Sequence, residues 1–215
     1  KVFGLAKKNL DDNFFDFNNT NIPIDSSIVS NYKEKTKEIE IYLNGKYSLE
    51  KPMILEDPYN FAPLTALIIF DTEKETKVSI EITGEDKEST IAKDFDNYTQ
   101  HHEIPVIGLY PDYDNKITIT ITDKEGKKKE KNLEIKTKEM PKNFVKIKLK
   151  KLDKDKVEQK FTFLDSIGPY DSIVDNNGDI RWYTQYKGQS VFKRLKNGNM
   201  IISDDEIALY GTKRL

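Results

Sequence analysis

The sequence of 215 residues predicts an all-β protein, in which an antiparallel β-sandwich precedes a single meander of the propeller-blade type. Short alternations of apolar and polar residues recur between residues 36 and 135 and are separated by turn residues. A continuous apolar run at residues 67–70 is typical of a strand that is buried on both faces. Two Asn-Gly pairs, at 177–178 and 197–198, separate short strands near the C-terminus, as in tight hairpins.

The N-terminal part divides into an arm and a first strand. Residues 1–30 are rich in Asn and Asp and show no sustained period, so we expect a loosely structured arm. From Thr36 the pattern changes, because Ile39, Ile41 and Leu43 alternate with more polar residues and stop at the turn pair 44–45. This alternation predicts a strand over residues 36–43.

The predicted sandwich covers residues 31–140. Its further strands are expected near residues 67–70, 78–82, 104–110, 117–121 and 133–135, with a turn at 123–126. Ile and Val face inward in these strands, and Thr, Glu and Lys face outward, as a sheet with one solvated face requires.

A connector is predicted over residues 141–165, beginning after Met140-Pro141. Val145, Ile147 and Leu149 alternate with lysines, which predicts an edge or connecting strand, since lysines discourage edge pairing. A further strand is expected at 161–163.

The first propeller blade is predicted over residues 166–215, as a meander in an incomplete propeller. Stacked repeats are stable mainly through their neighbours, and this chain holds one unit. We therefore expect this part to pair with another copy or to be the least protected part of the chain. Unless something covers them, the apolar residues that it would expose are Ile173, Trp182, Phe192 and Ile201.

Composition excludes several classes of function. A net charge of −2, from 35 basic and 37 acidic residues, favours neither nucleic acid nor a membrane surface as partner. The absence of cysteine excludes disulfides, thiolate metal sites and cysteine nucleophiles. No apolar run approaches the roughly 20 residues of a membrane span, and no signal peptide is visible. The first residue is Lys1 rather than methionine, so we expect a mature chain after signal removal or a trimmed piece.

Two stretches carry specific placements of proline, glycine and aromatic residues. Residues 57–67 read DPYNFAPLTAL, and residues 104–115 read IPVIGLYPDYDN; we call them the first and the second signature. Together, in this order, they resemble the N-terminal immunoglobulin-like domain of the bacterial aryl-sulfate sulfotransferases. Residues 175–183 and 194–201 are similar to the first propeller strands that follow this domain, so the resemblance covers about residues 36–215.

The resemblance implies an activity for a parent enzyme. The family transfers a sulfuryl group from a phenolic sulfate ester to a phenol, without a nucleotide donor or another cofactor. A propeller histidine carries the group as a sulfo-histidine, which splits one difficult transfer into two easier steps. Further histidines and an arginine stabilise the sulfuryl oxygens and the leaving phenolate.

The resemblance also implies where the parts of that enzyme lie. The catalytic residues are expected beyond Leu215, so no catalytic, cofactor-binding or metal-binding residue is predicted in this chain. The expected partners are the rest of the propeller, a second copy in a homodimer, and the aryl sulfate and phenol of the parent enzyme. The expected location is the periplasm or cell envelope.

His101 and His102 are the only histidines of the chain. One of them could be a nucleophile, or both could lie in a polar turn before a sandwich strand. We favour the turn, because the pair precedes the second signature inside the domain that the resemblance implies to be non-catalytic. Neighbouring strand residues also point to opposite faces, so the pair cannot readily converge on one substrate or metal.

Asp175, Asn177 and Asp179 suggest either a calcium loop or a hairpin turn. A calcium loop of the EF-hand type needs glycine at its sixth position and glutamate at its twelfth. Here Gly178 is fourth and Tyr186 is twelfth, so a hairpin turn is favoured.

Other conspicuous residues have a structural and a functional interpretation. Arg181 and Trp182 could line a propeller channel and meet an aromatic substrate, but packing of a buried Trp is the favoured alternative. Lysines at 124–131 and 146–156 could bind anions, but interspersed acidic residues favour a solvated surface. Four prolines are expected to fix loop geometry around the sandwich: Pro58, Pro63, Pro105 and Pro111.

Two other functional hypotheses remain beside the enzyme fragment. The chain could be a non-catalytic binding or adhesion module of the bacterial cell envelope. It could also be a complete enzyme, which is disfavoured because two adjacent histidines and no cysteine offer little catalytic machinery. The sequence beyond Leu215 would discriminate among these alternatives.

Overall fold

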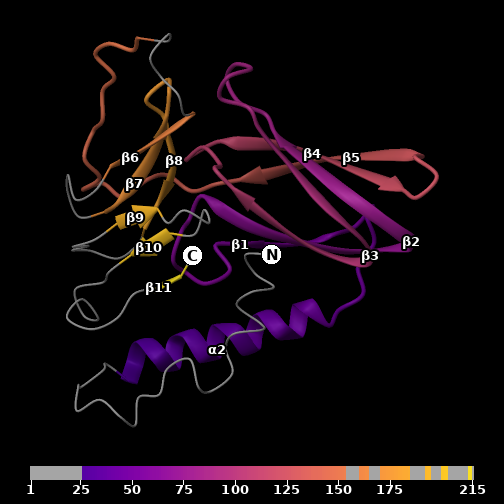
Figure 1. Cartoon of the computed structure of the whole chain (residues 1–215). Helices are drawn as coiled ribbons and strands as arrows, with labels where there is room; N and C mark the ends of the chain where they lie inside the picture. Colours follow the sequence, from indigo (N-terminus) through magenta and orange to yellow (C-terminus); the bar gives the residue numbers. More distant parts are fainter. Residues whose placement is uncertain are drawn as a thin grey trace.

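The computed structural model of the chain describes residues 26–153, 160–164, 170–184, 192–194, 200–202 and 213–214 (Figure 1). Over these residues the protein is mostly β-strand, as predicted, with a five-stranded antiparallel sheet and two three-stranded sheets. The arm expected over residues 1–30 lies outside the described residues up to residue 25. In the part of the chain that the structure describes, no helix combines the length and apolarity that crossing a membrane requires.

The strand predicted over residues 36–43 is wrong, because this segment belongs to helix α2, Ser26–Leu43. Ile39, Tyr42 and Leu43 pack into one apolar cluster, which matches the spacing of one helix face. Ile41, which a strand would place beside Ile39, is 73% exposed. The helix ends at Leu43, directly before the pair 44–45, and the Gly45 N–H donates to the Tyr42 carbonyl at 3.0 Å in a tighter final turn.

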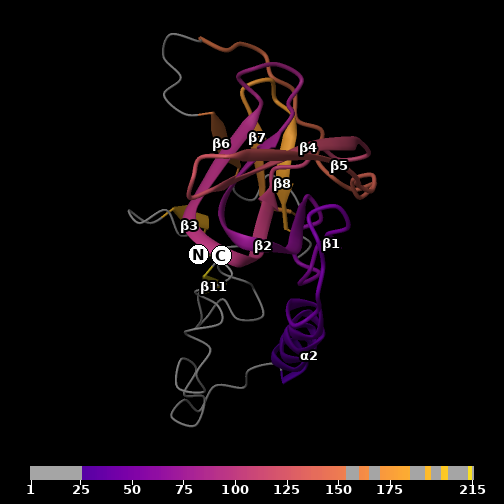
Figure 2. The same cartoon turned by 90° about the vertical axis from the view of Figure 1, so that its right-hand side faces the viewer.

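The largest sheet contains β1 (Met53–Glu56), β2 (Thr65–Ile82), β3 (Ile91–Ile107), β4 (Asp114–Asp123) and β5 (Lys128–Lys136). The first part of β2 pairs with β1 and β3, and its second part pairs with β3 and β4. Register shifts between Asp71 and Val78 separate the two parts. The sheet therefore curls, and Figure 2 shows its strands crossing around a common interior.

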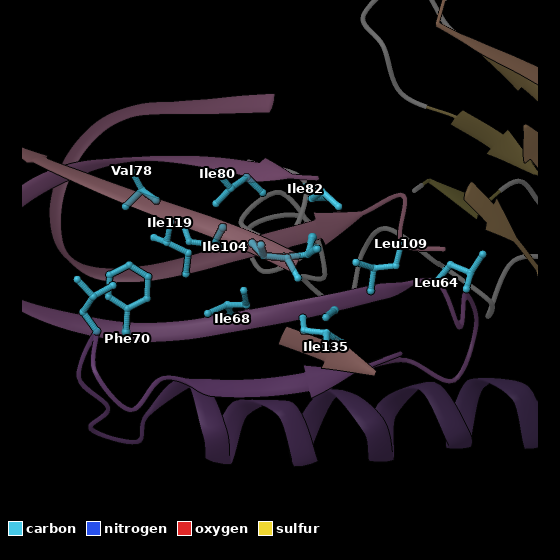
Figure 3. Packing of buried hydrophobic residues seen from close by; sticks show 14 of the residues in the cluster. Leu64, Ile68, Phe70, Val78, Ile80, Ile82, Ile104, Leu109, Ile119 and Ile135 are labelled. Atoms are coloured by element: carbon cyan, nitrogen blue, oxygen red, sulfur yellow. The ribbon is translucent and has the colours of Figure 1, made fainter. Parts of the chain in front are cut away.

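The main core lies inside this curled sheet. Ile68 and Phe70 from the first part of β2 join Val78 and Ile80 from its second part in one buried cluster. Figure 3 shows these side chains together with Ile119 of β4, all turned toward the same interior. The alternation predicted for the sandwich strands is thus confirmed at the level of side-chain burial.

The apolar run at residues 67–70 is buried on both faces, as predicted. Ile68 and Phe70 belong to the main core, whereas Leu67 and Ile69 form a second cluster with Ile39 of α2. Helix α2 lies beneath this part of the sheet in Figure 1. The helix therefore covers the face of β2 that points away from the main core.

The connector does not form the strand predicted at residues 145–149. Described residues 141–153 include no strand, although Phe144 and Ile147 pack against the main core. Val145 and Leu149 are exposed. The apolar alternation reflects side-chain packing along the surface of the core rather than a backbone ladder.

Two small sheets follow. One contains β6 (Phe161–Leu164), β7 (Ser172–Asp175) and β8 (Ile180–Tyr183) in the order β6-β7-β8. The other contains β9 (Phe192–Arg194), β10 (Met200–Ile202) and β11 (Lys213–Arg214) in the order β11-β10-β9. The strands expected in one meander are thus distributed over two sheets, and the single propeller blade stays a prediction.

Strands β7 and β8 form a hairpin that is covered by the curled sheet. Val174, Ile180 and Tyr183 belong to the main core. Trp182 is 5% exposed, so this residue, expected to be exposed unless something covers it, is covered by Phe61 and Ala62 of the same chain. Ile173 is half-buried beside it, and the side chains of Phe192 and Ile201 lie outside the described residues. This hairpin brings residues far apart in the sequence to one place.

Candidate functional site

The most concentrated polar site of the described residues surrounds Arg181, in the middle of β8. Its side chain is 1% exposed. Nε donates to the carbonyl of Gly108 at 2.8 Å, and Nη1 donates to the carbonyl of Ser89 at 2.8 Å. Nη1 also lies 2.9 Å from the Tyr110 hydroxyl and 3.0 Å from Asp175 Oδ2. One buried guanidinium thus joins two loops of the curled sheet, the β2–β3 loop with Ser89 and the β3–β4 loop with Gly108 and Tyr110, to its own hairpin.

Tyr110 contacts Arg181 in two ways. The guanidinium carbon lies 3.9 Å from the centre of the tyrosine ring, which adds a cation–π contact to the hydrogen bond. The Tyr110 hydroxyl also accepts from the backbone N–H of Glu85 at 3.2 Å. Burial raises the pKa of Tyr110, so the hydroxyl stays protonated at neutral pH.

The second signature holds these acceptors in place. Gly108 has a φ of +100°, a backbone conformation that favours glycine because residues with a Cβ are strained there. Asn115 is fully buried, and its Oδ1 accepts from the Tyr110 N–H at 2.7 Å. Its Nδ2 donates to the carbonyls of Tyr110 and Tyr113 at 3.0 and 3.1 Å. The residues that made this stretch conspicuous therefore shape one loop.

The first signature contacts the neighbour of Arg181. Trp182 packs with Phe61, Ala62 and Ile173, and the Phe61 and Trp182 ring centres are 6.2 Å apart. Asp57, at a φ of 40°, accepts from the N–H groups of Phe61 and Ala62 at 2.7 and 2.8 Å. The two signatures therefore contact adjacent residues of β8, Arg181 and Trp182.

The turn that joins β7 to β8 is a hairpin turn, as predicted. Oδ1 of Asp175 accepts from the N–H groups of Asn177 and Asp179, both at 3.0 Å, and Gly178 has a φ of +89°. The other oxygen of Asp175 pairs with Arg181. Both oxygens of this carboxylate are therefore engaged, one by backbone N–H groups of the turn and the other by the guanidinium. Among the described residues no group of three or more His, Asp or Glu side chains is arranged to hold a metal ion.

The two histidines lie within strand β3 rather than in a turn before it, because β3 begins at Ile91. The prediction that they point to opposite faces is confirmed. His102 is 4% exposed, its Nε2 lies 3.0 Å from the Thr76 hydroxyl, and its ring stacks on Phe70. Burial, followed by the nearby His101, lowers the pKa of His102 to about 4.

His101 lies among carboxylates on the exposed side of the sheet. Its Nδ1 is 2.8 Å from Asp71 Oδ1, and its Nε2 is 3.6 Å from Glu103 Oε1. An anionic ester would meet two like charges there. Neither histidine is therefore placed for attack on a sulfate.

An open hollow of about 420 Å³ lies beside the hairpin. Tyr110, Tyr113 and Phe144 form its apolar walls, and Glu85 and Asp179 contribute carboxylates. Burial, together with Asp175 and Glu85, raises the pKa of Asp179. Lys146 adds one cationic side chain to the same lining, so the hollow offers aromatic contact and charges of both signs, without a histidine.

The comparisons with known proteins match the chain in two consecutive segments. Residues 53–138 match the arylsulfotransferase Ig-like domain, and residues 146–212 match the arylsulfotransferase (ASST) family. The chain belongs to the arylsulfotransferase family. No curated protein matched it. The match over residues 53–138 confirms the immunoglobulin-like fold that was predicted for the first part of the chain.

The two arylsulfotransferase segments meet at the Arg181 site. Both signatures lie in the first segment, whereas the β7–β8 hairpin lies in the second. Arg181 and Trp182 were singled out by sequence, and packing was the favoured alternative for the Trp. Two partners of Arg181 could not be recognised, because Ser89 and Gly108 contribute only backbone carbonyls.

The remaining sequence candidates are surface features of the arylsulfotransferase chain. Lys129 and Lys131 pair with Glu50, at 2.8 and 3.2 Å, and Lys124 pairs with Glu75. These exposed pairs agree with the favoured solvated surface. Pro105 was expected to fix a loop, but it lies within β3, opposite Leu67. Strand β3 pairs only with β2, and proline is tolerated on an edge strand of this kind.

Proposed function

We propose that this chain is the N-terminal supporting part of an aryl-sulfate sulfotransferase, whose catalytic histidine lies outside these 215 residues. The observation that carries the proposal is the ordered match of both arylsulfotransferase segments, over residues 53–138 and 146–212. Export to the periplasm or cell envelope and assembly as a homodimer belong to the same proposal.

The proposed reaction of the parent enzyme has two displacements. A histidine nitrogen forms a bond to sulfur while the bond from sulfur to the phenolic oxygen breaks and the phenolate leaves. The acceptor phenol then gives its proton to solvent or to the released phenolate, and its oxygen forms a bond to sulfur while the bond from the histidine nitrogen to sulfur breaks, which returns the free imidazole. Cationic donors stabilise the charge on the sulfuryl oxygens in both steps.

The histidines of this chain support a role outside that chemistry. His102 is buried and engaged with threonine hydroxyls, so a sulfate ester has no access to its ring. His101 lies between Asp71 and Glu103, whose charges repel an anionic donor. The role left to the described residues is to support the second arylsulfotransferase segment, whose β7–β8 hairpin packs on the curled sheet.

The test is a sulfotransfer assay of this chain beside the product of the full gene. The donor is 4-nitrophenyl sulfate, the acceptor is phenol, and release of nitrophenol is followed. Activity in the full product alone supports the proposal. Activity in the 215-residue chain contradicts it and directs attention to His101. Inactivity of both, with the full product folded, favours a binding or adhesion module.

A further inference from the structure

The surface formed by the two signatures recognises a specific pair of side chains. The first signature encloses Trp182 with Phe61 and Ala62, and the second presents Gly108 and Tyr110 to Arg181. Both side chains come from one four-residue strand, β8. The immunoglobulin-like domain therefore has a binding surface for the hairpin that begins the second arylsulfotransferase segment.

We propose that Arg181 latches the β7–β8 hairpin onto the immunoglobulin-like domain, so that the hairpin folds only as part of that domain's core. The partner of the signature surface is thus a segment of the same chain, and the folding unit extends past the first matched segment to Thr184. The inference does not depend on sulfuryl transfer.

The hairpin cannot supply its own stability. Strands β7 and β8 have four residues each, and a short isolated hairpin is marginal in water. Its apolar residues Val174, Ile180 and Tyr183 are buried by the main core rather than by β6 alone. Docking therefore decides whether the hairpin is folded.

Arg181 makes that docking selective. A buried guanidinium is strongly unfavourable unless its charge and its donors find partners. In the docked arrangement Nε and Nη1 of Arg181 have partners, whereas Nη2 is buried without a hydrogen-bond partner among the described residues. Two carbonyls and a hydroxyl come from the immunoglobulin-like domain, and the carboxylate comes from Asp175 in the hairpin. The ion pair lies within the hairpin itself, so docking adds the two carbonyls and the hydroxyl, without which the buried guanidinium would lose most of its acceptors.

The geometry requires arginine rather than any cation. Nε donates to the carbonyl of Gly108 while Nη1 donates to the carbonyl of Ser89. The single ammonium nitrogen of lysine cannot reproduce this fork, and it does not stack on Tyr110 as a planar guanidinium does. Arg181→Lys keeps the charge and should still release the hairpin.

The test uses the full 215-residue chain and two local readouts. Trp182 is the only tryptophan, so its emission and its quenching by acrylamide report hairpin docking directly. Hydrogen exchange of β4 amides reports the curled sheet, and exchange of β7–β8 amides reports the hairpin. The variants are Arg181→Lys, Tyr110→Phe, and the control Lys136→Met, which removes an exposed ion pair with Asp114.

In Arg181→Lys we expect hairpin exchange about 100-fold faster, red-shifted emission and stronger quenching, with β4 protection retained. Tyr110→Phe, which loses one hydrogen bond to Arg181, should accelerate hairpin exchange about 10-fold. The control should change hairpin exchange less than about 3-fold.

Two results would overturn the latch. One is hairpin exchange at the wild-type rate in both Arg181→Lys and Tyr110→Phe. The other is equal loss of protection in β4 and in the hairpin for Arg181→Lys, with Tyr110→Phe leaving the hairpin unchanged. In that case Arg181 would stabilise the whole sheet rather than hold the hairpin.

Discussion

At the scale of single residues, Asn115 stabilises the loop that presents Tyr110. Five hydrogen bonds connect its amide to residues 110, 113, 135 and 137. Its position in the second signature singled it out by sequence, but its partners are mostly backbone groups, which sequence does not identify. A buried amide with this many backbone partners is difficult to replace.

We predict that Asn115→Ala lowers the free energy of unfolding by about 3 kcal/mol, because buried backbone groups lose their partners. Urea denaturation measures it. The matched control is Asn132→Ala, since Asn132 is exposed and accepts one hydrogen bond, from Thr118. It should cost less than about 0.5 kcal/mol. Equal losses in the two variants would refute the assigned role of Asn115.

The burial of His102 predicts a dependence of stability on pH. Its pKa is lowered from 6.5 to about 4 in the folded protein. Between these values the unfolded chain binds the proton and the folded chain does not, so stability falls as the pH falls. The stabilisation is complete above pH 6.5 and is lost toward pH 4.

The comparison of wild type with His102→Gln isolates this effect, because other groups titrate alike in both. We expect the unfolding free energy of wild type relative to the variant to drop by about 3 kcal/mol between pH 7.5 and pH 4. Nuclear magnetic resonance of the His102 ring should give a titration midpoint near 4. A midpoint near 6.5, with no pH-dependent difference, would contradict the prediction.

At the scale of elements, helix α2 shows where a period is ambiguous. Ile39, Ile41 and Leu43 fit a strand, whereas Ile39, Tyr42 and Leu43 fit a helix, and both sets occur in the same residues. The burial of Leu67 and Ile69 against Ile39 decides for the helix. A local pattern cannot reveal that the apolar face of β2 with Leu67 and Ile69 is buried by packing against this helix.

The helix predicts opposite outcomes for two neighbouring isoleucines. Ile39→Ala should lower the free energy of unfolding by about 3 kcal/mol, because it leaves a cavity between α2 and β2. Ile41→Ala should change it by less than about 0.5 kcal/mol, because Ile41 is exposed. Thermal or urea unfolding of both variants measures the difference. Similar losses would favour the strand, in which the two side chains share a face.

At the scale of the whole molecule, the boundary between the two arylsulfotransferase segments does not coincide with a boundary of the core. The first segment ends at residue 138, but Phe144, Ile147 and three residues of the β7–β8 hairpin pack in the main core. Trp182 was predicted to be exposed unless another surface covers it, and the first segment provides that cover through Phe61 and Ala62.

We predict that a chain of residues 26–138 is less stable than a chain of residues 26–184. Removing Val174, Ile180 and Tyr183 uncovers apolar core surface, and each such side chain contributes roughly 1.5–3 kcal/mol when fully buried. The expected difference in unfolding free energy is on the order of 5 kcal/mol. Urea denaturation followed by circular dichroism measures it, and equal midpoints with equal slopes would contradict the shared core.

The sequence by itself determined the β-class of the protein, the inner residues of most sandwich strands, the turn at Asn177-Gly178 and the arylsulfotransferase family. These follow from local periodicity, turn chemistry and motif residues, all of which are properties of short segments. Only the tertiary structure decided that α2 is a helix, that residues 145–149 form no strand, and that Arg181 is buried against the signatures. The first two depend on which apolar surfaces pack together although they are far apart in the sequence. The burial of Arg181 depends on backbone carbonyls, such as those of Ser89 and Gly108, which every residue type has.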